Sequence, residues 1–344
     1  MVVSGKSATK LSSNESPLGA SPKVVAALGV LADALPAYPD PESNALRQAL
    51  GEVHGLDAGK ILVGAGSDEI LHLLAQAYLE EGDEVIISEF GFLMYPIVTL
   101  GAGAVPVYAK DRDYRVDVDA ILAAVSKRTR IVFLANPNNP TGTYLAKSEL
   151  LRLHKGLRDD ILLVIDSAYA EYVNAPDYGA GDGLVMSSRN VVMVRTFSKI
   201  GLASLRIGWM FGDEKIIDAL NRIRGPFNVN LAAQVAGEAA VRDVEFIEKI
   251  KTHNAKWRDW LSAELNGNSM RVIPSQGNFI LTLFASANHA KKANDALLAN
   301  GLIVREMGAY GLGNGLRISI GEENAMKAVA RVLKNMNFAD LDSA

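Results

Sequence analysis

The chain of 344 residues contains no cysteine and no strong excess of either charge. The absence of cysteine excludes disulfides, thiolate nucleophiles and thiolate metal sites. A formal net charge of −4 does not favour binding to nucleic acid or to an anionic membrane. The sequence also lacks a signal-peptide core and any apolar run long enough to span a bilayer. We therefore expect a cytoplasmic protein that binds neither nucleic acid nor membrane.

Metal-ligand spacing is absent as well. The sequence predicts no metal site, because its five histidines are scattered along the chain (His54, His72, His154, His253 and His289). Hydrophobic residues make up 49% and charged residues 22%, which are ordinary values for a globular protein. The length is sufficient for two domains that share one active site.

From residue 61 onward, short apolar segments alternate with helical segments. The apolar segments show no polar face, which is typical of parallel strands buried on both sides. The expected strands are residues 61–63, 84–87, 105–108, 131–134, 161–165, 191–194 and 207–211. This pattern predicts a large α/β domain with a mostly parallel seven-stranded sheet.

The pattern changes after about residue 226. Residues 232–265 are mainly helical and long enough to link two domains, and residues 271–340 predict a smaller α/β domain. Its expected strands lie near Val272 and at 279–283, 303–304 and 316–320, with helices at 287–300 and 322–335.

The first 20 residues predict an extended arm, and a helix follows Ser21-Pro22, a cap followed by proline at the first helical position. We expect residues 1–35 to form an arm and helix that join the small domain. The large domain is then residues 36–240 and the small domain residues 241–344.

A lysine flanked by hydroxyl groups follows the apolar strand at 191–194. Lys199 lies close to Thr196 and Ser198, and Arg206 follows seven residues later. A desolvated lysine near another cation loses its proton readily and becomes an amine nucleophile. Hydroxyls and a guanidinium are groups that hold a phosphate dianion. Together they are typical of a lysine that forms a Schiff base with pyridoxal phosphate (PLP).

Two upstream strand ends carry further polar groups. Asn136 follows the strand at 131–134, and Asp166 with Tyr169 follows the strand at 161–165. In open α/β sheets ligands bind outside the carboxyl ends of the strands, so these groups can converge on Lys199. A carboxylate keeps the pyridine nitrogen of PLP protonated, and an amide and a phenol can bind the ring oxygen.

With these residues in this order, the chain resembles the fold-type I PLP-dependent aminotransferases. Within that superfamily it is most similar to the histidinol-phosphate aminotransferases, over residues 11–333. The segments that carry the resemblance are Leu11–Gly19, Tyr38-Pro39-Asp40, Gly64–Glu69, Asn136–Gly142, Arg195–Arg206, Gly277–Ile280 and Gly315–Ser319. The resemblance implies the PLP-dependent transferase fold, a large domain with a smaller α/β domain, and PLP as cofactor.

The resemblance also assigns residues to the cofactor. Gly66, Ser67 and Asp68 begin a helix whose free N–H groups suit the cofactor phosphate, with Asp68 contributing through its backbone. Phe92 is expected to stack on the pyridine ring, although Phe90 is an alternative.

By the same resemblance, Tyr38 should contact the cofactor phosphate of the neighbouring subunit. The protein would then be a homodimer with shared active sites.

For the substrate, the resemblance points to Arg305, Arg317 and Asn14. A single arginine suffices for a carboxylate, whereas two arginines suit a phosphate dianion. The implied substrates are the small molecules histidinol phosphate, as amino donor, and 2-oxoglutarate.

The nearest alternatives are an aromatic amino acid aminotransferase and a PLP-dependent phospho-amino-acid decarboxylase. A transcription regulator with an aminotransferase-like domain is disfavoured, because about 20 residues before the first helix leave no room for a DNA-binding segment.

Overall fold

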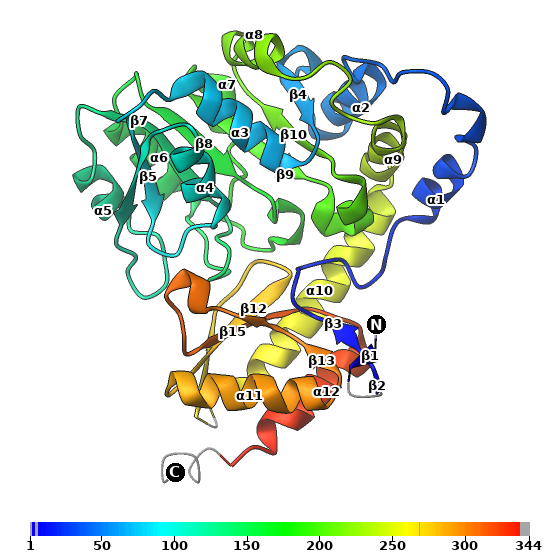
Figure 1. The fold of residues 1–344 in the computed structure, drawn as a ribbon, viewed down its shortest axis with the longest axis vertical. Helices are drawn as coiled ribbons and strands as arrows, with labels where there is room; N and C mark the ends of the chain where they lie inside the picture. Colours follow the sequence, from blue (N-terminus) through cyan, green and yellow to red (C-terminus); the bar gives the residue numbers. More distant parts are fainter. Residues whose placement is uncertain (1, 4–5, 268, 338–344) are drawn as a thin grey trace.

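The computed structural model describes residues 2–3, 6–267 and 269–337. Its largest sheet has seven strands in the spatial order β4-β10-β9-β8-β7-β5-β6 (Figure 1). Only β10 runs antiparallel to its neighbours, so the prediction of a mostly parallel seven-stranded sheet is confirmed. The strands are β4 (Ile61–Gly64), β5 (Glu84–Ser88), β6 (Val105–Ala109), β7 (Thr129–Ala135), β8 (Leu162–Asp166), β9 (Val191–Thr196) and β10 (Gly208–Phe211).

Both faces of this sheet are covered by helices, which explains why its strands carry no polar face. Along β7, Ile131 and Phe133 pack on one side, whereas Val132 and Leu134 pack on the other. The first side is covered by α3 (Ser67–Tyr78), α4 (Met94–Gly101) and α8 (Glu214–Ile223). The second is covered by α2 (Asn44–His54), α5 (Val118–Ala123), α6 (Lys147–Gly156), α7 (Asp182–Ser187) and α9 (Leu231–Val241).

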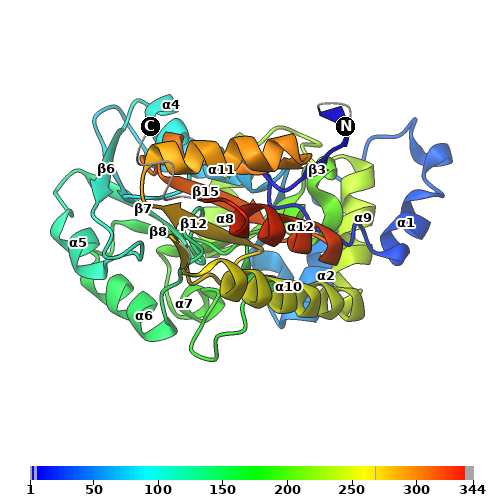
Figure 2. The ribbon, with the colours of Figure 1, turned by 90° about the horizontal axis from the view of Figure 1, so that it is seen from below.

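The smaller domain is built on an antiparallel sheet in the order β11-β12-β15-β14. Its strands are β11 (Met270–Ile273), β12 (Phe279–Phe284), β14 (Arg305–Glu306) and β15 (Gly315–Ser319). Figure 2 shows α10 (Val244–Leu265), α11 (Ala287–Ala299) and α12 (Glu323–Lys334) lying together on the outer side of this domain. The helix α10 links the two parts, because Ile250 is buried in the core of the large domain and Leu261 in that of the small one.

The N-terminal arm divides its contacts between the two domains. Its strand β3 (Thr9–Lys10) pairs in parallel with β13 (Leu302–Ile303) of the small domain. The helix α1 (Pro22–Leu28) instead packs on α9, with Val24 buried in the core of the large domain. The expectation that this helix joins the small domain is therefore wrong. The helix α9 is rich in alanine, so α1 can pack closely on it, and the sequence pattern of α1 alone does not reveal this partner.

The remaining elements are short. Two strands at the N-terminus, β1 (Val2–Val3) and β2 (Lys6–Ser7), pair with each other. The single-turn helices are η1 (Ala32–Ala34), η2 (Ala58–Lys60), η3 (Ala170–Tyr172), η4 (Ser198–Leu202), η5 (Ala203–Leu205) and η6 (Gly308–Tyr310). Within the described residues, no helix combines the length and the apolar character that crossing a bilayer requires.

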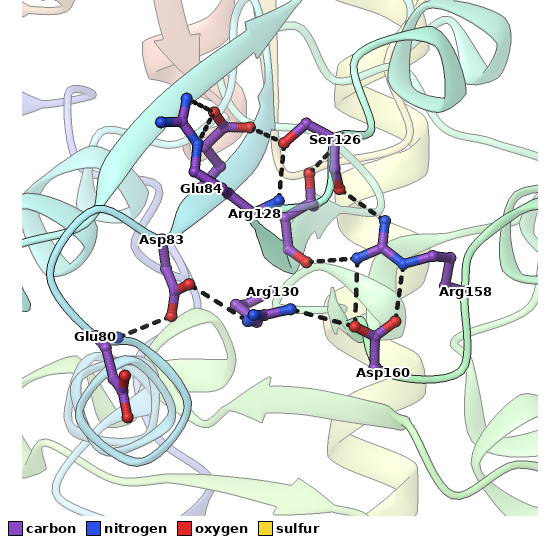
Figure 3. Close-up of polar contacts among 9 residues, drawn as sticks. Glu80, Asp83, Glu84, Ser126, Arg128, Arg130, Arg158 and Asp160 are labelled. Atoms are coloured by element: carbon purple, nitrogen blue, oxygen red, sulfur yellow. Dashed lines mark hydrogen bonds and ion pairs between the residues drawn. The ribbon is translucent and has the colours of Figure 1, made fainter.

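A network of charged side chains joins the starts of β5, β7 and β8 (Figure 3). Glu84 is buried and accepts hydrogen bonds from the Ser126 hydroxyl and the Arg128 guanidinium. The Ser126 hydrogen bond contributes most to holding the pKa of Glu84 below its usual value. Arg130 contacts Asp160 at 3.2 Å. The network therefore ties together the amino ends of these strands, at the opposite end of each strand from its carboxyl end.

Candidate active site

The carboxyl ends of β7, β8 and β9 surround a cavity of about 270 Å³. The N-terminus of α3 and the N-terminal arm complete its wall. The lining residues are Ser13, Glu15, Ser67, Asp68, Phe92, Ala135, Pro137, Asn139, Asp166, Ala168, Tyr169, Thr196, Ser198, Lys199, Ala203 and Arg206. Polar side chains that follow β8 and β9 therefore line one cavity, and the loop after β7 contributes Asn139 to it.

Lys199 lies in the turn η4 that follows β9, and its side chain is half-buried in the cavity wall. Its Nζ lies 5.6 Å from the centre of the Tyr169 ring. The backbone carbonyl of Lys199 accepts a hydrogen bond from the buried Tyr172 hydroxyl. This contact holds the turn in place, and it joins the segment after β8 to the segment after β9.

One end of the cavity is suited to an anion. The guanidinium of Arg206 donates to the Ser198 hydroxyl at 3.3 Å, and Ser198 also accepts a hydrogen bond from the Thr196 hydroxyl at 3.0 Å. Ser67 and Asp68 begin α3 here, where backbone N–H groups have no partner within the helix. The Asp68 carboxylate accepts from Arg206 at 3.1 Å, so in this structure it lies beside the cation.

The backbone at Gly66 requires glycine. Its φ of +85° is in the left-handed region, and an added Cβ would lie 2.9 Å from Nη2 of Arg206. The glycine therefore leaves the space that the arginine occupies beside the start of α3.

The Asp166 carboxylate is buried at the end of β8. It accepts hydrogen bonds from the Tyr95 hydroxyl at 2.9 Å and from the Ala168 backbone N–H at 3.2 Å. Burial, opposed by these hydrogen bonds and by the charge of Lys199, raises the pKa of Asp166 to about 6. Tyr95 was not predicted as a site residue, because the sequence does not indicate that a side chain of α4 reaches the end of β8.

The structure does not bring the Asn136 side chain into the cavity, which corrects the prediction for this residue. Its amide binds the backbone of Leu145, accepting from the N–H at 2.8 Å and donating to the carbonyl at 3.2 Å. Asn139, three residues later, lines the cavity instead. Asn136 closes the loop after β7, and Asn139 of this loop lines the same cavity as Tyr169 and Asp166.

Asn14 of the N-terminal arm is buried between the domains. Its amide donates to the Tyr169 hydroxyl at 2.9 Å, and its carbonyl oxygen accepts from the Ser319 hydroxyl at 2.9 Å. Its immediate neighbours Ser13 and Glu15 line the cavity. Asn14 was predicted to bind substrate, and the structure shows that it contacts Tyr169 directly.

Arg317 on β15 is buried beside the cavity. It donates to Oδ1 of Asn139 at 2.5 Å and to the carbonyl of Ser12 at 2.7 Å, and its Nε has no partner in the described part of the chain. Arg305 is exposed and lies directly opposite Arg317 in the β14–β15 pair, so both side chains are on one face of the sheet. Burial lowers the pKa of Arg317, and the charge of Arg305 adds to the effect.

The three aromatic residues that the sequence analysis singled out for the cofactor lie in three different places. Phe92 lines the cavity. Phe90 stacks on Tyr114, with ring centres 5.6 Å apart, in an apolar cluster with residues of the small domain. Tyr38 is 82% exposed and stacks on Phe227, outside the cavity of its own chain.

A family model for aminotransferase class I and II matches residues 6–333. The chain belongs to this family. It is 53% identical over 326 residues to a histidinol-phosphate aminotransferase from Rhodospirillum rubrum, covering 94% of this chain and 89% of the relative. It is 50% identical over 328 residues to a protein of the same name from a Ruegeria species, covering 95% and 90%.

Among solved structures, this chain is similar to a histidinol-phosphate aminotransferase from Sinorhizobium meliloti in complex with pyridoxal-5′-phosphate. The TM-score is 0.90 at 29% identity, and the match covers 96% of this chain and 90% of that one. The predicted fold, that of the fold-type I PLP-dependent transferases, is confirmed by these matches.

Proposed function

We propose that this chain is a PLP-dependent aminotransferase that converts histidinol phosphate and 2-oxoglutarate into imidazole-acetol phosphate and glutamate. Membership of the aminotransferase family and the two relatives at 50% identity or more support the proposal. The observation that carries it is that Lys199, Asp166 and the Ser198–Arg206 pair line a single cavity.

The lining residues fit PLP. Arg206, Ser198 and the start of α3 suit the phosphate group, and the buried carboxylate of Asp166 suits the protonated pyridine nitrogen. Phe92 offers an aromatic ring in the same wall. When bound, PLP supplies an electron sink that stabilises charge developing on the α-carbon of the amino donor.

In this arrangement Lys199 holds the cofactor and moves the proton that leaves the α-carbon of the donor. Tyr169, whose hydroxyl accepts a hydrogen bond from Asn14, lines the cavity with its ring centre 5.6 Å from Nζ of Lys199. Asn139 contributes an amide to the same wall and orients Arg317.

The two arginines are assigned to the anionic ends of the substrates. Arg317, with a buried and unpaired Nε, binds a carboxylate or a phosphate oxygen, and Arg305 adds a second positive charge on the same sheet face. This pairing supports a phosphate dianion as the preferred ligand. The carboxylates of 2-oxoglutarate use the same groups in the second half-reaction.

The active form is proposed to be a cytoplasmic homodimer with shared active sites. The support is that Tyr38 lies exposed, outside the cavity of its own chain, so that its hydroxyl is available to a second copy.

The substrate is tested by measuring kcat/KM for histidinol phosphate, phenylalanine and threonine phosphate with 2-oxoglutarate as acceptor. Histidinol phosphate should give the highest value, with glutamate formed in equal amount. A higher value for phenylalanine would favour an aromatic aminotransferase, and release of CO₂ from a phospho-amino acid would favour a decarboxylase.

The role of Arg305 can be tested with Arg305→Gln. Charge-assisted hydrogen bonds contribute about 1.5–3 kcal/mol each, so kcat/KM for histidinol phosphate should fall about 10–150-fold. The value for phenylalanine should fall far less, because Arg317 alone can bind its carboxylate. Arg317→Gln is the matched variant and should reduce both values. Equal losses for the two substrates in Arg305→Gln would contradict the proposed recognition of phosphate.

A further inference from the structure

Tyr95 on α4 is held rigidly beneath the cavity. The residue is fully buried, and its ring stacks on Phe133 with centres 4.9 Å apart and planes at 8°. The ring of Phe92, which lines the cavity, meets it edge-on at 5.7 Å. The direction of the Tyr95 hydroxyl is therefore determined by packing rather than by solvent.

That hydroxyl donates to Oδ2 of Asp166 at 2.9 Å. An ionised carboxylate only accepts hydrogen bonds, so the phenol must be the donor and the contact stabilises the charged form of Asp166. The other carboxylate oxygen, Oδ1, accepts from the N–H of Ala168 at 3.2 Å. Both oxygens are thus fixed in position, and the plane of the carboxylate is defined.

The charged groups around Asp166 act on its ionisation in opposite directions. Asp68 on α3 acts against ionisation of Asp166, whereas Lys199 after β9 favours it. Tyr169 and Tyr310 also face the Tyr95 hydroxyl, and burial is the main cause that raises its own pKa. Tyr95 therefore stays protonated, and remains a donor, at any pH at which the protein works.

We propose that Tyr95 is a positioning residue for the transamination, because its hydroxyl keeps Asp166 ionised and oriented toward the cavity. This inference rests on the proposed function, in which Asp166 supports the pyridine nitrogen of the cofactor. Tyr95 touches neither substrate nor cofactor in this role and acts only through Asp166.

The direct test is a titration of Asp166 in the apoprotein labelled with ¹³C-carboxyl aspartate, with Asp166→Asn identifying its resonance. In Tyr95→Phe the ring and its stacking remain, but the donor is lost. One hydrogen bond to a charged group corresponds to about one to two pH units, so the midpoint of Asp166 should move up by that amount. An unmoved midpoint overturns the inference.

Tyr144→Phe is the matched control. The Tyr144 hydroxyl donates to Oδ1 of Asp177 at 2.7 Å, the same phenol–aspartate contact at an exposed site. This variant should leave the Asp166 midpoint and the turnover unchanged. If it moves the midpoint as far as Tyr95→Phe does, the inference fails.

A double-mutant cycle separates positioning from a general structural effect. Tyr95→Phe alone should lower kcat about 10–100-fold, with KM for the amino donor changed less than about threefold. In an Asp166→Asn background, the same substitution should cost less than about threefold. Losses that multiply would show that Tyr95 acts independently of Asp166 and would overturn the inference. If Asp166→Asn is itself fully active, the proposed role of Asp166 fails first, and the inference with it.

Should Tyr95→Phe fail to fold, 3-fluorotyrosine incorporated into the wild-type apoprotein supplies the second measurement. A more acidic phenol donates a stronger hydrogen bond, so the Asp166 midpoint should move down. No change in the midpoint would overturn the inference.

Discussion

At the scale of single residues, the proposed chemistry of the site depends on Lys199. It is the one amine among the residues that line the cavity, within the described part of the chain. Lys199→Ala should abolish turnover while leaving the fold intact, because in the proposed mechanism the residue both tethers the cofactor and carries the proton.

The check is borohydride reduction followed by peptide mapping. In the wild type the reduced cofactor should be attached to Lys199, and the variant should melt at nearly the same temperature. Attachment to a different lysine would contradict the assignment.

A second residue prediction concerns the pH dependence of stability. The pKa of Asp166 is raised to about 6 by burial, against about 3.9 in an unfolded chain. The folded apoprotein therefore binds this proton more tightly, and the corresponding stability is present below about pH 4 and lost as the pH rises through 6. Asp166→Asn should stabilise the apoprotein at pH 7.5 by up to about 3 kcal/mol, and hardly at all at pH 4.

Urea unfolding of the apoprotein at the two pH values measures this difference. An equal gain at both would mean that ionisation of Asp166 is not the cause. The same substitution should reduce turnover by orders of magnitude, which would show that the buried charge is retained for function.

At the scale of elements, two asparagines of the loop between β7 and α6 have different contacts. Asn136 closes the loop through Leu145, and Asn139 faces the cavity and Arg317. Asn136→Ala should lower the free energy of unfolding by about 1–3 kcal/mol, because it leaves buried backbone groups without partners. Asn139→Ala should cost at least tenfold in kcat/KM with little effect on stability.

Urea unfolding and steady-state kinetics on both variants check this division. A larger catalytic loss in Asn136→Ala than in Asn139→Ala, at unchanged stability, would restore Asn136 as the residue that acts in the site. The sequence shows both asparagines in one turn-rich segment, and only the path of the loop decides which side chain faces the ligand.

Elements that pair with distant partners were harder to predict. The apolar segment at 303–304 was expected to form one strand, but the structure splits it. Leu302–Ile303 pairs with the N-terminal arm, and Arg305–Glu306 pairs with β15. The two short strands belong to different sheets because each pairs with a different partner. The local sequence carries no information about either partner.

At the scale of the whole molecule, the exposed position of Tyr38 leads to a prediction about assembly. If its hydroxyl binds the cofactor phosphate of a second subunit, Tyr38→Phe should weaken PLP binding by about 1.5–3 kcal/mol. Mixing this variant with Lys199→Ala should yield heterodimers in which one site has both Lys199 and a partner's Tyr38.

Equilibrium titration with PLP on the mixed and unmixed proteins measures the recovery. Sedimentation at low concentration provides the control for assembly. A fully active monomer would exclude the shared site.

Much of this protein could be predicted from its sequence. Buried strands have a local signature, because a strand covered on both faces is apolar throughout, and the seven strands of the large sheet were placed within two residues of their observed ends. Lys199, Asp166 and Arg206 follow such strands, and the carboxyl ends of parallel strands must meet at one edge of the sheet. Strand order in the sequence therefore already implied their convergence.

Tertiary structure alone decided which side chains complete the site. Tyr95 reaches Asp166 from α4, which packs on β5 and β6. Asn139 lines the cavity in place of Asn136, whose amide binds the Leu145 backbone, and α1 packs on α9 rather than on the small domain. Each of these contacts joins segments whose local patterns are compatible with several neighbours. The choice is made by how the whole chain packs, and no short stretch of sequence contains it.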